Sequence, residues 1–185
     1  MKHATKIKLG SEVICIDPCY DDAALGVKLP VIPGSYYCYV SRVEDERIAS
    51  ISVRHVDHTD VAIDMEYAPA GSNTRNYVGV DSGQAGIIDF NAWQAYVAHP
   101  KDESVAEAWY QQACALTLSR LQYGIMVDND CNWREAAYGL VSSSGYGDGC
   151  YRVYVAKNGV DIVGIRIEFI YPDKLNKVFE ESIIP

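Results

Sequence analysis

The sequence predicts an α+β protein made mainly of antiparallel β-structure, in one or two packed sheets, with one long amphipathic helix and one short helix. Short apolar runs rich in β-branched and aromatic residues alternate with turn residues, and one stretch repeats its apolar residues at helical spacing. The chain has 185 residues, of which 49% are hydrophobic. This length suits one full core and is short for two ordinary domains, so we expect residues 1–185 to form a single domain.

The predicted strands are runs of apolar, β-branched and aromatic residues bounded by Gly, Pro, Asn, Asp or Ser. They cover residues 11–17, 36–43, 47–56, 61–67, 77–81, 87–90, 125–128, 139–143, 151–157 and 160–170. Residues 36–43 and 47–56 flank a charged connection and predict a β-hairpin. Asn158-Gly159 predicts a second, because a two-residue turn with positive φ favours that pair. The prolines and glycines of residues 25–34 predict a loop.

The helix prediction covers residues 102–122, where the spacing of apolar residues changes to about 3.6. Ser104 with Glu107 fits a capping box, and Gly124 fits a helix stop. The apolar stripe of this helix is predicted to contain Tyr110, Cys114, Leu118 and Leu121, and Trp109, Ala113 and Leu116 widen it. A shorter helix is predicted over residues 90–98. A sheet face and an apolar helical stripe must each be buried, so we expect the sheets to pack against the long helix.

Charge and composition exclude several functional classes. A net charge of −9 argues against direct nucleic-acid binding, which depends on clustered Lys and Arg. The sequence contains neither a signal-peptide pattern nor an apolar stretch long enough to span a membrane, so no membrane association is expected. Six cysteines in a chain of this length do not suggest a disulfide scaffold. We therefore expect reduced, buried thiols and a cytoplasmic location.

Two loops rich in Gly and Asp form the candidate ligand-binding site. They are residues 80–86 and residues 142–149. Glycines let a ligand approach the backbone closely, and Asp, Ser and Gln supply polar groups. The predicted binding residues are Asp81, Ser82, Gln84, Tyr146 and Asp148. The alternative is that both loops are tight connections whose glycines only permit positive φ.

An enzymatic alternative uses the same loops. If they meet, Asp81 and Asp148 could form a carboxylate pair for acid and base catalysis, as in a hydrolase. No His lies in a recognised motif beside a nucleophilic Ser or Cys, so no catalytic residue is assigned.

We expect neither a metal nor a cofactor. Residues 128–132 begin like a calcium loop, but Trp133 and Gly139 stand where such a loop needs Gly and Glu. No second Cys or His pair completes a zinc site with Cys15 and Cys19, or with His55 and His58. A looser cation site at residues 128–132, or a structural zinc ion, remains a minor alternative.

The two loops also carry a resemblance to known sequences. The segment 80–86 contains Asp81-Ser82-Gly83, and the segment 144–154 contains Gly145-Tyr146-Gly147-Asp148-Gly149. In this order they resemble the D-S-G-x-x-G and G-x-G-D-G-x-Y-x-V-Y segments of a family of uncharacterised bacterial and bacteriophage proteins. The turn Asp17-Pro18-Cys19-Tyr20 is similar to one near the start of the phage members. The resemblance spans residues 11–169.

The resemblance implies a phage-type accessory protein of the host cytoplasm and assigns no catalytic role. Small acidic proteins of this kind often bind a host protein or a small signalling molecule. The leading hypothesis is therefore recognition of a host protein or a small polar ligand through the two Gly/Asp loops. The alternatives are the hydrolase described above and a structural component of a virion. The sequence is also compatible with a homo-oligomer.

Overall fold

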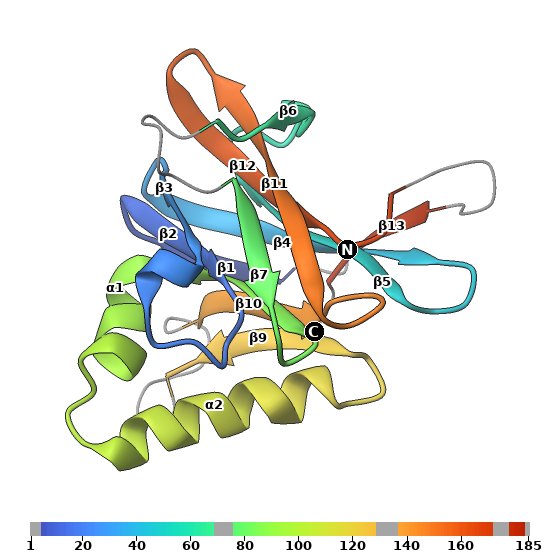
Figure 1. Cartoon of the computed structure of the whole chain (residues 1–185). Helices are drawn as coiled ribbons and strands as arrows, with labels where there is room; N and C mark the ends of the chain where they lie inside the picture. The colour runs from blue at the N-terminus through green and yellow to red at the C-terminus, as the bar shows by residue number, and fades with distance from the viewer. Residues whose placement is uncertain (1–4, 69–75, 129–136, 172–177, 184–185) are drawn as a thin grey trace.

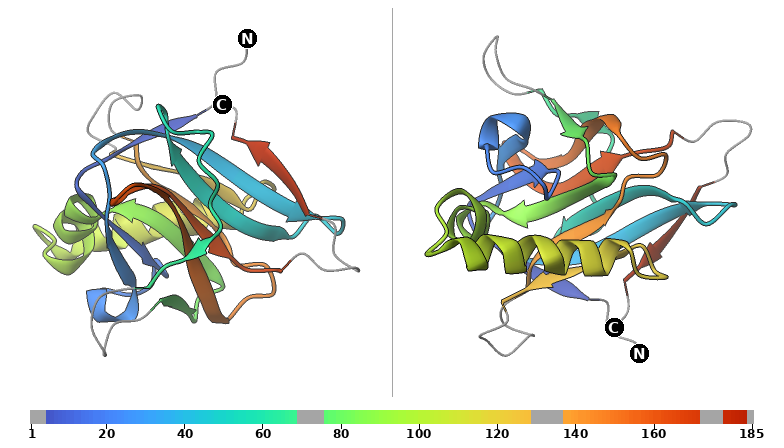
Figure 2. Two further views of the ribbon diagram at one scale, coloured as in Figure 1. Left: turned by 90° about the horizontal axis from the view of Figure 1, so that it is seen from above. Right: turned by 60° about the horizontal axis from the view of Figure 1, so that its bottom comes forward.

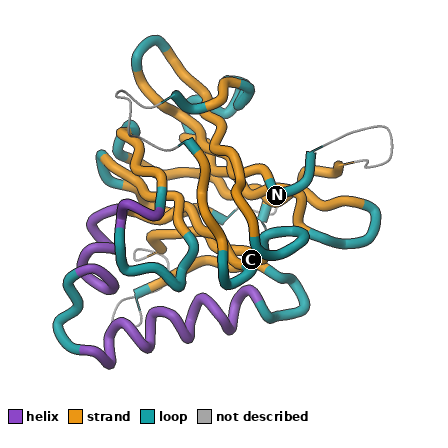
Figure 3. The backbone as a smooth tube through the Cα atoms, viewed as in Figure 1, coloured by secondary structure: helices purple, strands orange, loops and turns teal. Residues whose placement is uncertain are grey.

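The computed structural model describes residues 5–68, 76–128, 137–171 and 178–183, which form three layers (Figure 1). An eight-stranded sheet packs against a five-stranded sheet, and the helices cover the outer face of the five-stranded sheet. Figure 2 shows α2 (Glu103–Thr117) lying across this face, and Figure 3 shows the helices gathered on one side of the molecule. The prediction of a mainly antiparallel β-structure with packed sheets is confirmed.

The larger sheet has the order β1-β4-β5-β12-β11-β6, with β13 beside β4 and β7 beside β11. Its strands are β1 (Lys6–Leu9), β4 (Gly34–Val43), β5 (Ile48–His55), β6 (Met65–Glu66), β7 (Tyr77–Val80), β11 (Gly149–Asn158), β12 (Asp161–Glu168) and β13 (Val178–Ser182). The smaller sheet has the order β3 (Val27–Pro30), β2 (Glu12–Ile16), β8 (Gln84–Asp89), β10 (Ala137–Ser143) and β9 (Tyr123–Val127). Each strand pair of the described residues is antiparallel.

The main core lies between the two sheets and follows from the alternation of side chains along the strands. In β4, Tyr36, Cys38 and Val40 are buried, and residues between them are less so. These side chains meet those of the smaller sheet, including Cys15 and Ile87, in one cluster. Both predicted hairpins are confirmed: β4 pairs with β5, and β11 pairs with β12 around Asn158 and Gly159.

A second core lies between the smaller sheet and the helices. Trp93 of α1 (Phe90–Trp93) and Trp109 of α2 are buried against Ile88 and Met126 of the sheet. A π-helical turn (Gln94–Ala98) follows α1 directly, so the short helix predicted over residues 90–98 is confirmed.

The predicted long amphipathic helix is not confirmed, because α2 ends at Thr117. The Ser119 hydroxyl donates to Leu116 O (2.7 Å), and Gln122, at φ 62°, reverses the chain before β9. The buried residues of α2 are Trp109, Ala113 and Thr117, so the helix buries the side on which Trp109 and Ala113 widen the predicted stripe. Leu118 is 82% exposed and Leu121 is 56% exposed, so both fall outside the core.

Both ends of α2 differ from the predicted signals. The N-cap is Asp102, whose carboxylate accepts the Ser104 N–H at 3.0 Å, while Glu107 instead accepts from Gln111. Gly124 is no helix stop. It lies in β9, where any Cβ would overlap the Leu116 side chain, so it permits the strand to approach α2.

Three strands were not predicted, namely β1, β3 and β13. The loop prediction for residues 25–34 is therefore wrong at β3, where Val27 and Leu29 are buried and Lys28 and Pro30 are exposed. β3 lies at a sheet edge, where a strand tolerates proline. Of residues 61–67, only Met65–Glu66 form a strand. Among the described helices, none is long and apolar enough to cross a membrane.

Candidate functional site

The two Gly/Asp loops lie in contact with each other. β7 pairs with β11, and the last pair of this ladder is Val80 with Gly149. Asp81 follows Val80 and Asp148 precedes Gly149, so the two aspartates stand opposite each other just beyond the end of the ladder. The backbone N–H of Ser144 then donates to the carbonyl of Gly83 (2.9 Å). Nonlocal strand pairing thus joins the two loops that the sequence singled out.

A third connection, the turn after β2, holds the first loop in place. Asp17 in this turn is fully buried. Its carboxylate accepts the backbone N–H groups of Asp81 and Ser82 (both 2.8 Å) and the Ser82 hydroxyl (2.5 Å). It also accepts the backbone N–H of Cys19 at 2.9 Å. Residues 17–20, 81–83 and 144–148 therefore meet, and we call them together the loop junction.

The exposed part of the loop junction is acidic and aromatic. Asp81 and Asp148 are exposed, and Ser82 is half-buried. Tyr146 is 65% exposed, and the Arg47 guanidinium lies over its ring, 4.9 Å from the centroid. Four of the five predicted binding residues thus lie at one surface, where they offer two carboxylates, a hydroxyl and an aromatic ring.

Gln84, the fifth predicted residue, lies beneath this surface. It is 6% exposed and begins β8, whose next residue faces the core between the sheets. Its amide nitrogen contacts Cys114 Sγ of α2 at 3.6 Å, and its Oε1 is buried without a hydrogen-bond partner among the described residues. The side chain therefore links the first loop to α2 and is not presented to solvent.

The left-handed backbone of the loops explains their glycines. The φ angle is 69° at Gly83, 67° at Gly145 and 101° at Gly147. Residues other than glycine rarely adopt such values. Next to Gly147, the Ser144 and Tyr151 hydroxyls donate to the Gly147 carbonyl at 2.8 and 2.6 Å. The glycines are thus required by the turns, as the alternative interpretation supposed, and the same turns present the two aspartates.

Hydrogen bonding and burial set the protonation of two groups in the junction. A hydrogen bond to the Asp81 carboxylate raises the pKa of Tyr20 to about 12. Burial, together with a hydrogen bond to Asp17, raises the pKa of Cys19 to about 12. Both groups keep their protons at neutral pH. Cys19 is therefore a neutral thiol here and not an activated nucleophile.

Sequence reasoning did not include Asp17, Cys19 or Tyr20 among the binding residues. A signal is present in the sequence, because the turn Asp17-Pro18-Cys19-Tyr20 is part of the resemblance. Its distance along the chain from the first loop gave no hint that Asp17 bonds to Asp81 and Ser82.

The cysteines and the metal alternatives can also be placed. The described cysteines are free; Cys15 and Cys38 are buried as expected, but Cys19 and Cys150 are exposed. The described residues contain no group of three or more His, Cys, Asp or Glu side chains placed to hold a metal ion. Most of the calcium-like segment 128–132 lies outside the described residues.

The fold and the junction define a class: an antiparallel protein of two sheets and a helical layer, with three connections joined at a buried carboxylate. The family profile described as "Protein of unknown function (DUF4241)" matches residues 8–164. The chain belongs to this family, because the match covers most of its length. No curated protein and no solved structure matches the chain.

Proposed function

We propose that this protein is an accessory or regulatory binding protein that recognises a partner protein or a small polar ligand at the loop junction. The observation that carries the proposal is the contact between the two Gly/Asp loops through Ser144 and Gly83. This contact gathers Asp81, Asp148 and Tyr146 on one surface. Carboxylates supply strong hydrogen-bond acceptors, and an exposed tyrosine supplies apolar area with a polar end.

The rigidity of the first loop supports a binding role. The Asp17 carboxylate fixes the backbone at Asp81 and at Ser82, so a ligand would meet a loop that is already ordered. Binding to an ordered loop avoids much of the conformational entropy that a flexible loop would lose. Burying the Asp17 carboxylate carries a desolvation penalty, which its hydrogen bonds to two successive N–H groups must offset. A connection with no further role would not need such a buried charge.

The kind of partner follows from charge and from the resemblance of the sequence to bacterial and bacteriophage proteins. With a net charge of −9 and two exposed carboxylates at the junction, the protein suits a partner with a basic surface. A phage-type protein would meet such a partner, a host protein, in the host cytoplasm. The proposal includes no direct contact with nucleic acid.

Hydrolase-like chemistry is the second candidate, and the opposed positions of Asp81 and Asp148 favour it. Both carboxylates are exposed. A catalytic pair usually needs one carboxyl group in an apolar setting that keeps it protonated. The binding role requires no such setting, and for this reason we place it first.

The test compares three immobilised proteins exposed to the same bacterial lysate. They are the wild type, the junction variant Asp81→Asn/Asp148→Asn, and the control variant Asp60→Asn/Asp64→Asn. The control removes the same charge from exposed residues in the connection after β5. Retained proteins and metabolites are quantified by mass spectrometry. We expect at least one species to be retained by the wild type and the control and lost from the junction variant. Identical retention by all three would refute the proposal.

A further inference from the structure

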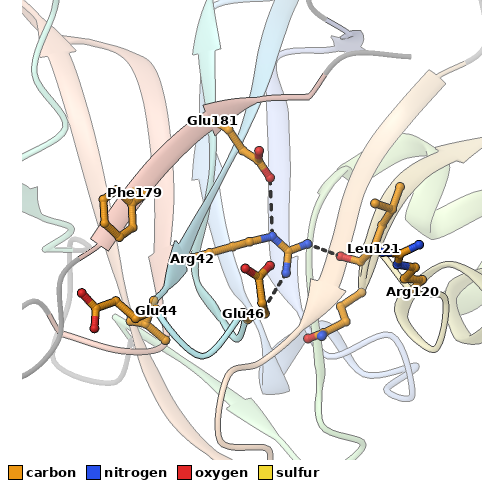
Figure 4. Close-up of a pocket in the computed structure, with 9 residues that line it drawn as sticks. Arg42, Glu44, Glu46, Arg120, Leu121, Phe179 and Glu181 are labelled. Carbon is orange, nitrogen blue, oxygen red and sulfur yellow. Dashed lines mark hydrogen bonds and ion pairs between the residues drawn. The ribbon is translucent and has the colours of Figure 1, made fainter.

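A pocket of about 980 Å³ lies beside the loop junction, at the end of the molecule where β4 and β13 approach the connection between α2 and β9 (Figure 4). This volume is at the upper end of the range for ligand sites. Its walls come from three separate parts of the chain. The lining residues are Arg42, Val43, Glu44, Glu46, Arg120, Leu121, Gln122, Phe179 and Glu181.

Arg42 is a fixed part of the wall. Its guanidinium donates to the carbonyls of Glu46 (2.6 Å) and Leu121 (2.5 Å), and it pairs with the Glu181 carboxylate at 3.4 Å. It also lies over the Tyr123 ring. With these partners Arg42 joins the two sheets at the pocket, and its charge is already compensated.

Two residues of the pocket have a backbone conformation that residues other than glycine rarely adopt. Glu46 has φ 68° and Gln122 has φ 62°. The backbone carbonyl of each residue accepts a hydrogen bond. The donor to Glu46 is the Arg42 guanidinium, and the donor to Gln122 is the backbone N–H of Ser143 (2.8 Å). Such strain persists only where surrounding contacts impose it, and it is common at binding sites. Here both residues stand in the two connections that border the pocket.

The groups left available are two carboxylates, two apolar side chains and the exposed guanidinium of Arg120. In the described part of the chain, the exposed carboxylates of Glu44 and Glu46 have no hydrogen-bond or ion-pair partner. Leu121 is 56% exposed and Phe179 is 59% exposed. Arg120 lies beyond Leu121, on the side away from Arg42 (Figure 4). With Arg42 paired to Glu181, the two free carboxylates outnumber the one remaining cation among the described lining residues, Arg120, so the pocket offers a net negative charge beside apolar side chains.

The pocket is continuous with the loop junction. Arg47 follows Glu46 in the β4–β5 turn and stacks on Tyr146 of the second loop. Across the pocket, the Ser143 hydroxyl of that loop donates to the Gln122 side chain at 3.2 Å. These two contacts place the second loop directly beside the pocket.

We propose that this pocket binds a basic segment of a partner protein. Lys or Arg side chains of this segment pair with Glu44 and Glu46, and its apolar side chains pack on Leu121 and on Phe179, which lie on opposite sides of Arg42 (Figure 4). The pairing of free carboxylates with exposed apolar area selects this occupant over an acidic or purely apolar one. The inference rests on the proposed binding role and adds the chemical class of the partner.

The test uses the full chain and three fluorescein-labelled peptides, whose sequences are Lys-Leu-Lys-Leu-Lys, Glu-Leu-Glu-Leu-Glu and Lys-Ser-Lys-Ser-Lys. Fluorescence anisotropy measures binding to the wild type and to Glu44→Gln/Glu46→Gln, Leu121→Ser and the control Asp60→Asn/Asp64→Asn. We expect the Lys-Leu peptide to bind the wild type and the control equally, and the carboxylate variant about tenfold more weakly or worse. Leu121→Ser should weaken the Lys-Leu peptide and leave the weaker Lys-Ser peptide unaffected.

Several results would overturn the inference: no binding of the Lys-Leu peptide to the wild type, unchanged binding to the carboxylate variant, or an equal loss in the control. Because Glu44 and Glu46 are exposed, the carboxylate variant should keep the wild-type melting temperature. Leu121→Ser tests the pocket through a different side chain.

The junction variant Asp81→Asn/Asp148→Asn separates the two proposals. If only that variant loses the peptide, the junction binds it and the pocket does not. If only the pocket variants lose it, the inference stands without the junction.

Discussion

Asp17 and Ser82 lie 65 positions apart in the chain, yet the Asp17 carboxylate accepts both the backbone N–H and the hydroxyl of Ser82. Asp17 is fully buried, so these bonds replace the water that the carboxylate loses on folding. The turn after β2 and the loop after β7 consequently behave as one unit. The position of Asp81, and with it the acidic surface of the loop junction, depends on this unit.

Asp17→Asn should destabilise the protein by about 2 to 4 kcal/mol, because the amide presents N–H groups where the site supplies only donors. Asp22→Ala is the comparison. Asp22 is an exposed N-cap that accepts the Ala24 N–H at 2.9 Å, and its loss should cost about 1 kcal/mol or less. Urea unfolding of both variants gives the two free energies. Equal, small effects would show that the buried carboxylate does not hold the fold at this point.

Asp81→Asn should lower the pKa of Tyr20 from about 12 toward its ordinary value of 10.0, since the hydrogen bond to the Asp81 carboxylate is the main cause of the rise. NMR titration of protein labelled at the tyrosine Cζ carbon measures this pKa directly. Asp148→Asn serves as the control and should leave Tyr20 unchanged. An unaltered Tyr20 in the Asp81 variant would mean that the two side chains do not interact.

Although the Cys19 residue is largely exposed, its thiol should be slow to alkylate at neutral pH, because partial desolvation of the thiol and its hydrogen bond with Asp17 raise its pKa from 9.0 to about 12. Folding therefore favours the protonated thiol. The resulting contribution to stability is complete below pH 9.0 and is lost as the pH rises toward about 12. Iodoacetamide labelling with mass spectrometry, followed from neutral to alkaline pH, measures the thiolate. Asp17→Asn should accelerate it, and fast labelling of the wild type at neutral pH would contradict the assignment.

The strand predictions succeeded where local pattern and burial agree. The alternation of buried and less buried residues in β4 and the Asn158-Gly159 turn are both local signals. The structure confirms the strand and the hairpin that they predict. The predicted α2 stripe was centred on Tyr110 and Cys114, whereas the helix buries Trp109 and Ala113 at its edge, because the two sets are about equally apolar. Only packing against the smaller sheet decides between the two stripes. β3 was missed because prolines in residues 25–34 resemble a loop.

The candidate site was predictable in composition and not in assembly. Gly83 and Gly147 marked the loops, since positive φ has a sequence signature. The pairing of β7 with β11, which brings Asp81 opposite Asp148, joins residues far apart in the chain and has none. The bonds of Asp17 to the first loop and those of Arg42 to Leu121 and Glu181 are equally nonlocal. They could be read only from the folded chain.

Gly145→Ala should destabilise the protein more than Gly83→Ala. Both glycines have positive φ, and alanine costs about 1 kcal/mol in such a conformation. A Cβ at Gly145 would also lie 3.0 Å from the Ile48 carbonyl oxygen, whereas a Cβ at Gly83 would have only ordinary contact with Gly147. Thermal unfolding of the two variants checks the order. A reversed order would mean that the second loop can shift without cost.

The central claim is that the loop junction is the binding surface, and hydrogen–deuterium exchange tests it most directly. The full chain is labelled alone and in the presence of the lysate fraction that the immobilised wild type retains, and exchange is followed by mass spectrometry. We predict slower exchange in residues 81–84 and 144–148 when the partner is present, with residues 57–64 unchanged. Protection confined to other segments, or no protection at all, would contradict a binding role for the loop junction.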